Sequence, residues 1–483
     1  MKKSKLIETL KRFEASELER LRAFLQQPPT KGRPPSSDEQ RLLDYLLPHF
    51  PDFDSESLDR EKVFRALYPE GKWVKGKLEK RMTSLLYWIQ RFICWDRWDQ
   101  RAHPIERELL LADFYEERGS ERLSEWSMRR MQKLLKSDSI RDKSYYLRAF
   151  RVQNKIAEYQ SLNHNTRKRQ LDFPHPQESL EVLYLIHKLT YYCALLSIKG
   201  YPMAPDTQAE LDRLEALGEN PTERPHLHLP LLRAYALALI FLRHRDREDA
   251  YRQLQGVLEK HDNQFSLRDR QSLRAFCRNF SIYHSNQGRL DYQAETFRIY
   301  QADLQRGLLY YHNGLTVSTL RNIVTSGLLQ KQFDWVRKFL EEHRSRIVGA
   351  LRPEEIYHFN LARYHFALGE HAVALDLIAD HYDDLYYQIA ARRLEIMIHY
   401  ETDSPLLDAK LDAFKTFLYR LSKKQISEHQ RRGNQHFFNA LRQILHPQTP
   451  FDDQRVRRLI EKWQGQSVLV EKDWLLEKLR DLT

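Results

Sequence analysis

The chain has 483 residues, and its 78 Lys and Arg against 67 Asp and Glu give a net charge of +11 at neutral pH. This excess is spread over many residues and predicts a mixed solvated surface, although it also allows attraction to nucleic acid, acidic peptides or anionic lipid. The hydrophobic content of 41% argues against a disordered chain, and three cysteines without a CxxC pair argue against a disulfide framework or a cysteine zinc site.

Glycine is scarce, at 15 of 483 residues, which favours helices over sheets. Residues 1–100 are predicted to form an N-terminal helical module. Apolar residues at helical spacing predict two short helices over 1–26 and further helices over 37–47, 58–67 and 75–92. Helix 58–67, a glycine-containing turn and helix 75–92 follow one another as in a helix-turn-helix, so a possible one is placed at 58–92.

The predicted helix over 75–92 has an apolar stripe starting at Leu78 and a basic face opposite it. The residues of that face are Lys77, Arg81, Ser84, Trp88 and Arg91. Cations and hydroxyl groups contact phosphates, and aromatic rings stack on bases. The five residues of this face are therefore candidates for nucleic-acid binding. The arrangement resembles bacterial activators that carry a DNA-binding helix-turn-helix ahead of a helical-repeat domain, but it lacks their flanking strands and wing. The alternative is that Trp88 packs inside while the cations face solvent.

Residues 101–200 are predicted to form further helical hairpins, interrupted by a break around the basic triplet at 167–169. A Pro-containing connection is predicted over 201–230, because five prolines lie between Gly200 and the end of that range. We expect a domain or subdomain boundary there.

From residue 231 the chain repeats a pattern of helix, polar turn and helix. Its anchors, at steps of 43, 43 and 38 residues, are Ala238, Ser281, Val324 and Ala362. The last unit also has Gly369 at the turn and the small residue Ala374 in its second helix, whereas Lys331 replaces the turn glycine one unit earlier. This small/large pattern resembles tetratricopeptide (TPR) hairpins, although the steps exceed their period of about 34 residues.

Residues 231–448 are therefore predicted to be a TPR-like solenoid, and 449–483 to form C-terminal capping helices. The predicted fold class is all-α, an α-solenoid of TPR-like helical hairpins with an N-terminal helical module. With segments such as LDREKVFRALYPEG and YHFNLARYHFALGEHAVALDLI, the whole chain resembles a group of uncharacterised bacterial helical-repeat proteins. No function follows from that resemblance.

The predicted solenoid carries polar residues in register. Asn279, Asn322 and Asn360 occupy the same place in successive first helices. Their arginine neighbours are Arg278, Arg321 and Arg363. The asparagine position resembles one that TPR proteins use to hydrogen-bond the backbone or terminal carboxylate of an extended peptide, and guanidinium groups suit carboxylates. The alternative is that the asparagines bond between adjacent helices and hold the superhelix together.

No pattern for metal or catalytic chemistry stands out. The pair His226 and His228 is flanked by prolines and has no carboxylate close by. The other grouped histidines, which fit surface positions better than a metal site, are His358, His365 and His371. The sequence contains no nucleophile elbow and no phosphate loop. We therefore expect no metal, no cofactor and no enzyme activity.

The function predicted from these features is a non-enzymatic protein-binding scaffold or adaptor. Its solenoid groove would take a protein partner, such as an acidic or extended peptide segment. The alternative is a nucleic-acid-binding regulator that uses the basic helix over 75–92, with the solenoid as partner or dimerisation domain. A cytoplasmic location is expected, because the sequence shows neither a signal-peptide pattern nor an apolar run long enough to span a bilayer, and no small-molecule substrate is evident.

Overall fold

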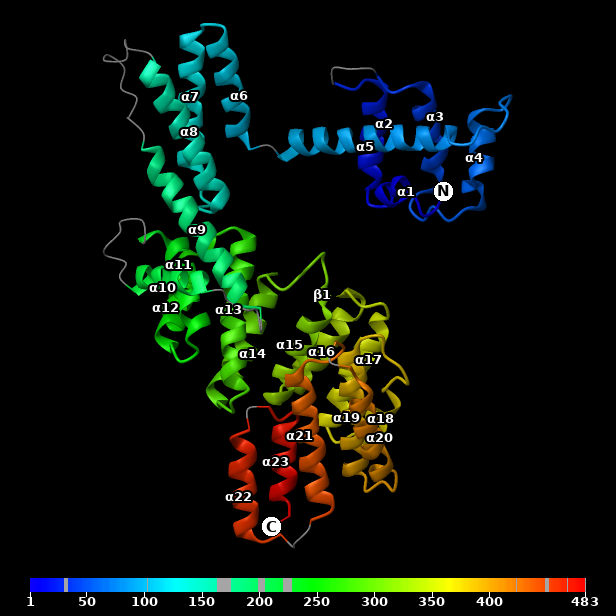
Figure 1. The fold of residues 1–483 in the computed structure, drawn as a ribbon, viewed down its shortest axis with the longest axis vertical. Coiled ribbons are helices and arrows are strands. Elements are labelled where there is room, and N and C mark those ends of the chain that lie inside the picture. The colour runs from blue at the N-terminus through cyan, green and yellow to red at the C-terminus, as the bar shows by residue number, and fades with distance from the viewer. Residues whose placement is uncertain are drawn as a thin grey trace. The chain divides into compact units, whose positions relative to one another are not determined.

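A computed structural model gives the fold of the chain (Figure 1). The described residues are 1–29, 34–101, 103–162, 175–198, 205–219, 228–422, 424–447, 451–466 and 468–482. They form 23 α-helices and two strands of two residues each, which confirms the predicted all-α fold class. His226 and the basic triplet at 167–169 lie outside the described residues.

By its internal packing the chain divides into two units, which are described separately. The first comprises Met1–Ser137 and Glu158–Lys168, and the second comprises Asp138–Ala157 and Arg169–Thr483. Among the described helices, none combines the length and the apolar character that crossing a bilayer requires.

The N-terminal part of the first unit is a bundle built around one long helix. Its helices are α1 (Lys5–Leu10), α2 (Ala15–Gln26), α3 (Ser37–Leu46), α4 (Arg60–Leu67) and α5 (Lys77–Arg101), with short 3-10 turns η1 (Leu47–His49) and η2 (Glu56–Leu58) between α3 and α4. The apolar stripe predicted from Leu78 is buried along α5, which packs against α1, α2 and α3 (Figure 1). Every helix predicted in this range is present, and α5 continues past residue 92 to Arg101.

Helices α6 (Pro104–Glu117) and α7 (Glu121–Ser137) form a tightly packed hairpin in the first unit. Gly119 lies in the turn with a φ of +67°, a backbone conformation that glycine adopts more readily than residues with a Cβ atom. Helix α8 (Lys143–Leu162) begins in the second unit, and its last residues belong to the first.

The second unit is a succession of packed helices. Its first members after α8 are α9 (Pro176–Leu196), α10 (Pro205–Glu219), α11 (Pro230–Arg243), α12 (Glu248–His261), η6 (Asp262–Gln264), α13 (Leu267–Ser285) and α14 (Leu290–Gln305). Helix α11 packs against α9, α10, α12 and α13, which explains why its sequence is apolar on nearly every side. Helix α10 lies inside the range predicted as a Pro-containing connection. It begins at Pro205, a position where the missing N–H of proline costs no hydrogen bond.

Hairpins continue through the rest of the second unit. They comprise α15 (Val317–Leu329), α16 (Phe333–His343), η7 (Arg344–Arg346), α17 (Pro353–Ala367), α18 (His371–Asp376), α19 (Leu385–Glu401) and α20 (Leu407–Arg420). Strand β1 (Leu315–Thr316) pairs in parallel with β2 (Ile347–Val348) beside them. Helices α21 (Glu428–Leu445), α22 (Asp453–Gln464) and α23 (Lys472–Arg480) share the last hydrophobic core with α19 and α20.

Four successive hairpin turns show the repeat register directly. Gly288, Lys331, Gly369 and Asp403 lie between the two helices of their hairpins, and each has a positive φ. The first two spacings between them, 43 and 38 residues, equal the steps between the sequence anchors of the same units. Lys331, with a φ of +52°, adopts the left-handed conformation for which glycine is the usual choice.

Candidate functional site

The basic face predicted on α5 is turned towards other parts of the first unit. The Lys77 amino group lies 3.6 Å from the centroid of the Tyr68 ring. The Arg81 guanidinium forms ion pairs with Asp38 (3.0 Å) and Glu39 (3.2 Å) at the start of α3. The two cations at the N-terminal end of the face are therefore already occupied by partners within the protein.

Glu39 is the centre of this contact between α3 and α5. Its side chain is only 2% exposed. Burial raises its pKa, but hydrogen bonds from Ser36, Ser84 and Arg81 outweigh burial and hold the pKa of this carboxyl below its usual value. Ser84 and Arg81 thus act together as donors to one buried carboxylate, which is a structural use of predicted phosphate-binding residues.

Trp88 and Arg91 complete the basic face. Trp88 is 5% exposed and packs in the core with Phe24, their ring centroids 6.5 Å apart. Arg91 lies over the Trp88 ring, 5.0 Å from its centroid, and also reaches the Tyr87 hydroxyl at 3.3 Å. A buried indole cannot stack on a base unless the core opens, so the geometry favours the alternative that Trp88 packs inside.

The predicted groove arginines fall into two groups, and the first is neutralised. Arg278 on α13 forms an ion pair with Asp303 on α14, whose side chain is fully buried. Arg274, one turn earlier, also binds Asp303, at 3.3 Å, and reaches Asp262 at 3.5 Å. Asn279, the neighbour of Arg278, is exposed.

The second group is Arg321 on α15 and Arg363 on α17, and among the described residues no carboxylate lies within ion-pair distance of either. The Arg321 guanidinium lies over the Tyr386 ring, 4.1 Å from its centroid. Arg363 donates to the Thr325 hydroxyl at 3.0 Å, one turn along α15 from Arg321. Both positive charges also act on the buried hydroxyl of Tyr387, whose pKa burial raises to about 12. The structure thus brings these two arginines to one region of α15, α17 and α19, which we call the Arg321–Arg363 face.

The three predicted asparagines do not share one environment. Asn279 is exposed, and the side-chain oxygen of the partly buried Asn322 accepts a hydrogen bond from its neighbour Arg321 at 3.3 Å. Asn360 is fully buried, and its amide donates to the Ile356 carbonyl at 2.8 Å within α17. The aromatic partner of Arg321 was not predicted from the sequence, because Tyr386 lies on a different helix.

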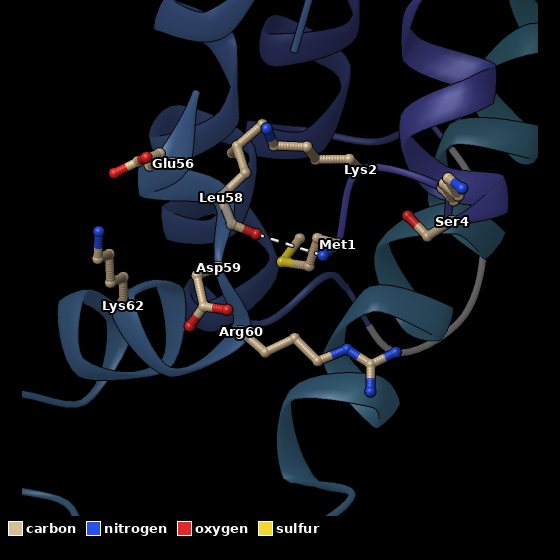
Figure 2. Close-up of a pocket in the computed structure, with 9 residues that line it drawn as sticks. Met1, Lys2, Ser4, Glu56, Leu58, Asp59, Arg60 and Lys62 are labelled. Carbon is tan, nitrogen blue, oxygen red and sulfur yellow. Dashed lines mark hydrogen bonds between the residues drawn. The ribbon is translucent and has the colours of Figure 1, made fainter. Parts of the chain in front are cut away.

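Two further features bear on metal binding and catalysis. Within the described residues no group of three or more His, Cys, Asp or Glu side chains could hold a metal ion. A cavity of about 650 Å³ lies at the start of α1 and α4 in the first unit (Figure 2). Its lining mixes cations and carboxylates, and Lys2 is paired with Asp54 at 2.8 Å. Figure 2 shows the Arg60 and Lys62 side chains diverging, so this lining offers no convergent catalytic set.

Comparison of the chain with protein-family models, with curated proteins and with solved structures finds no match in any of the three. The assignment of function therefore depends on the geometry described above.

Proposed function

We propose that the protein acts by binding, without covalent chemistry, and that the Arg321–Arg363 face takes an acidic or extended segment of a protein partner. The observation that carries the proposal is the contrast between two pairs of arginines in one unit. Arg274 and Arg278 have the buried carboxylate of Asp303, whereas the partners of Arg321 and Arg363 are an aromatic ring, an amide oxygen and a hydroxyl. Guanidinium groups held in place by such contacts are prepared for a carboxylate from outside.

The repeat architecture supports this mode of action. Stacked hairpins offer a large fixed surface and position partners by shape and charge. A TPR-like relationship, predicted from the sequence, is supported by the glycine turn between α17 and α18 and by the 34 residues that separate Gly369 from Asp403. The proposal for the partner, however, depends only on the two arginines and their surroundings.

A labelled Asp- and Glu-rich peptide, with its C-terminus free in one version and amidated in another, tests the proposal by fluorescence anisotropy. We expect the variant Arg321→Ala/Arg363→Ala to bind the peptide about 100-fold more weakly, because each charge-assisted hydrogen bond contributes about 1.5–3 kcal/mol. A difference in affinity between the free and the amidated peptide would identify the terminal carboxylate as the group that is recognised. The matched control is Arg337→Ala on α16, where an exposed arginine pairs with Glu341 one turn away.

Equal affinity of the double variant and the parent protein would contradict the proposal. So would a loss of folding of the double variant, measured by circular dichroism, because the arginines would then serve the fold. The competing function, nucleic-acid binding through α5, is tested with the same chain by titrating salt against labelled duplex DNA and single-stranded RNA. Phosphate contacts give a steep loss of affinity with salt, so tight, salt-sensitive binding that Arg81→Ala weakens would favour it instead.

A further inference from the structure

Helix α9 has apolar side chains on two opposite sides. Its buried stripe packs against α11 and includes Ile186 and Leu189. On the opposite side Leu180, Tyr184 and Tyr191 are 47%, 54% and 59% exposed. These exposed side chains share their side of the helix with charged residues, and the Lys188 amino group lies 4.8 Å from the centroid of the Tyr184 ring. Among the described helices only α11 packs extensively against α9, so the apolar part of this side is open in the described part of the second unit.

The first half of α8 lies beside α9. The Ser179 hydroxyl donates to Gln153 at 2.8 Å, and residues near the start of α8 line a cavity together with residues near the end of α9. The two helices therefore run antiparallel. Leu180, Tyr184 and Tyr191 are called the tyrosine strip below. From Leu180 to Tyr191 it extends about 16 Å, at about 1.5 Å per helical residue.

One end of the tyrosine strip opens into a cavity of about 410 Å³. Tyr191 and His187 of α9 form one wall, Lys143 of α8 forms a second, and the start of α13 with Arg268 forms a third. The cavity thus joins an aromatic surface to the first turns of two other helices. Its volume falls within the range of pockets that hold a large side chain or a small ligand.

The charged residues around this cavity differ in whether they have partners within the protein. Asp142 accepts a hydrogen bond from the backbone of Tyr145, and the buried Asp269 accepts from the hydroxyls of Tyr235 and Ser266, each at 2.6 Å. Both carboxylates are therefore occupied at the starts of α8 and α13.

The cations of the cavity have no such partner. No described carboxylate lies within ion-pair distance of Lys143 or Arg268. Burial lowers the pKa of His187, and the nearby Lys143 charge lowers it further. The cavity end of the strip is accordingly suited to a negative charge from outside.

We propose that the tyrosine strip and its cavity bind an amphipathic helix of a partner protein. Apolar side chains of that helix, at positions i, i+3 or i+4 and i+7, would cover Leu180, Tyr184 and Tyr191, and an acidic side chain at one end would reach Lys143 and Arg268. The length of the strip matches three turns of helix. This site differs from the Arg321–Arg363 face in every residue, so each proposal can fail without the other.

A display library of helical peptides, selected on the full-length chain, provides the probe. We expect the enriched peptides to combine a three-turn apolar stripe with Asp or Glu at one end. Tyr184→Asp/Tyr191→Asp should weaken a selected peptide about 30-fold or more, since buried tyrosines at interfaces are among the strongest contributors to affinity. Lys143→Ala/Arg268→Ala should weaken it about tenfold and reduce its dependence on salt. Tyr419→Asp, which alters an exposed tyrosine on α20, is the matched control and should bind normally.

Enrichment of peptides without this pattern, or peptides that bind the Tyr184→Asp/Tyr191→Asp variant as well as the parent, would overturn the proposal. Circular dichroism of each variant confirms that a loss of binding is not a loss of folding. Sedimentation of the chain alone gives a further outcome. A dimer that Tyr191→Asp dissociates would show that a second copy covers the strip, and the partner-helix proposal would then be wrong.

Discussion

Arg81 on α5 and Arg321 on α15 are both partly buried, and both are flanked by tyrosines. Arg81 has two carboxylates within 3.2 Å, and one of them, Glu39, is buried. Arg321 lies over Tyr386 and bonds to the amide of Asn322, with no described carboxylate beside it. The difference shows that a cation on a helix face says little about function until its counter-charge is known. An arginine paired internally serves the fold, whereas one without a carboxylate is the better candidate for binding a ligand.

The largest expected effect is at the most deeply paired arginines. The side chain of Asp303 is fully buried and pairs with both Arg274 and Arg278. Asp303→Asn removes its negative charge. Leaving two largely buried guanidinium groups without that charge should lower the free energy of unfolding by about 3 kcal/mol or more. Urea denaturation followed by circular dichroism measures this, with Asp412→Asn on the exposed side of α20 as the control. An unchanged midpoint of the urea transition would show that a buried counter-charge does not distinguish arginines that stabilise the fold from arginines that do not.

A smaller effect, dependent on pH, is expected at Glu39. Its pKa lies below the usual value, so its contribution to stability is complete above about pH 4.5 and is lost as pH falls through the lowered pKa. Glu39→Gln should therefore lower the free energy of unfolding of the first unit by about 1–2 kcal/mol at neutral pH. The difference from the parent should shrink in acid. Tryptophan fluorescence during urea unfolding at several pH values tests this, because Trp88 is buried in the same core.

The matched control for this experiment is Glu61→Gln on α4, an exposed glutamate that pairs with Arg65 one turn away. We expect little change in its unfolding at any pH. If the free energies of unfolding of Glu39→Gln and the parent differ by the same amount at neutral and acidic pH, that result would show that the ionised carboxylate is not the form that stabilises the fold.

Much of the fold could be predicted from the sequence because its signals are local. The stripe starting at Leu78 and the repeat anchors follow from residue spacing along one helix or one hairpin, and the structure places both as expected. The start of α10 also had a local signal, Pro205 at the first helical position, but the surrounding prolines outweighed it in the prediction of a connection.

The candidate sites could be predicted only in part, because they depend on contacts between distant residues. Arg81 and Glu39 are 42 positions apart, and Arg363 and Thr325 are 38 apart. Helical spacing correctly indicated that Arg81 lies away from the stripe of Leu78. It could not show that α3 covers that side, since a second helix packs there through tertiary contacts. The tyrosine strip was missed for a different reason, because residue spacing along one helix does not show which of its apolar sides another helix covers.

The smallest expected change in stability is at the Arg321–Arg363 face, and it sharpens the comparison most. Arg321→Ala/Arg363→Ala breaks no internal ion pair. It removes one stacking contact with Tyr386, one hydrogen bond to Thr325 and one to the adjacent Asn322 side chain. Each is worth about 1 kcal/mol or less at a partly exposed site, so the free energy of unfolding should fall by no more than about 1–2 kcal/mol. Removing two positive charges that have no counter-charge also relieves repulsion, which offsets part of that cost. Urea denaturation beside Arg274→Ala/Arg278→Ala gives the direct test, because the same chemical change there strands the buried Asp303. Equal destabilisation of the two double variants would mean that both pairs of arginines serve the fold.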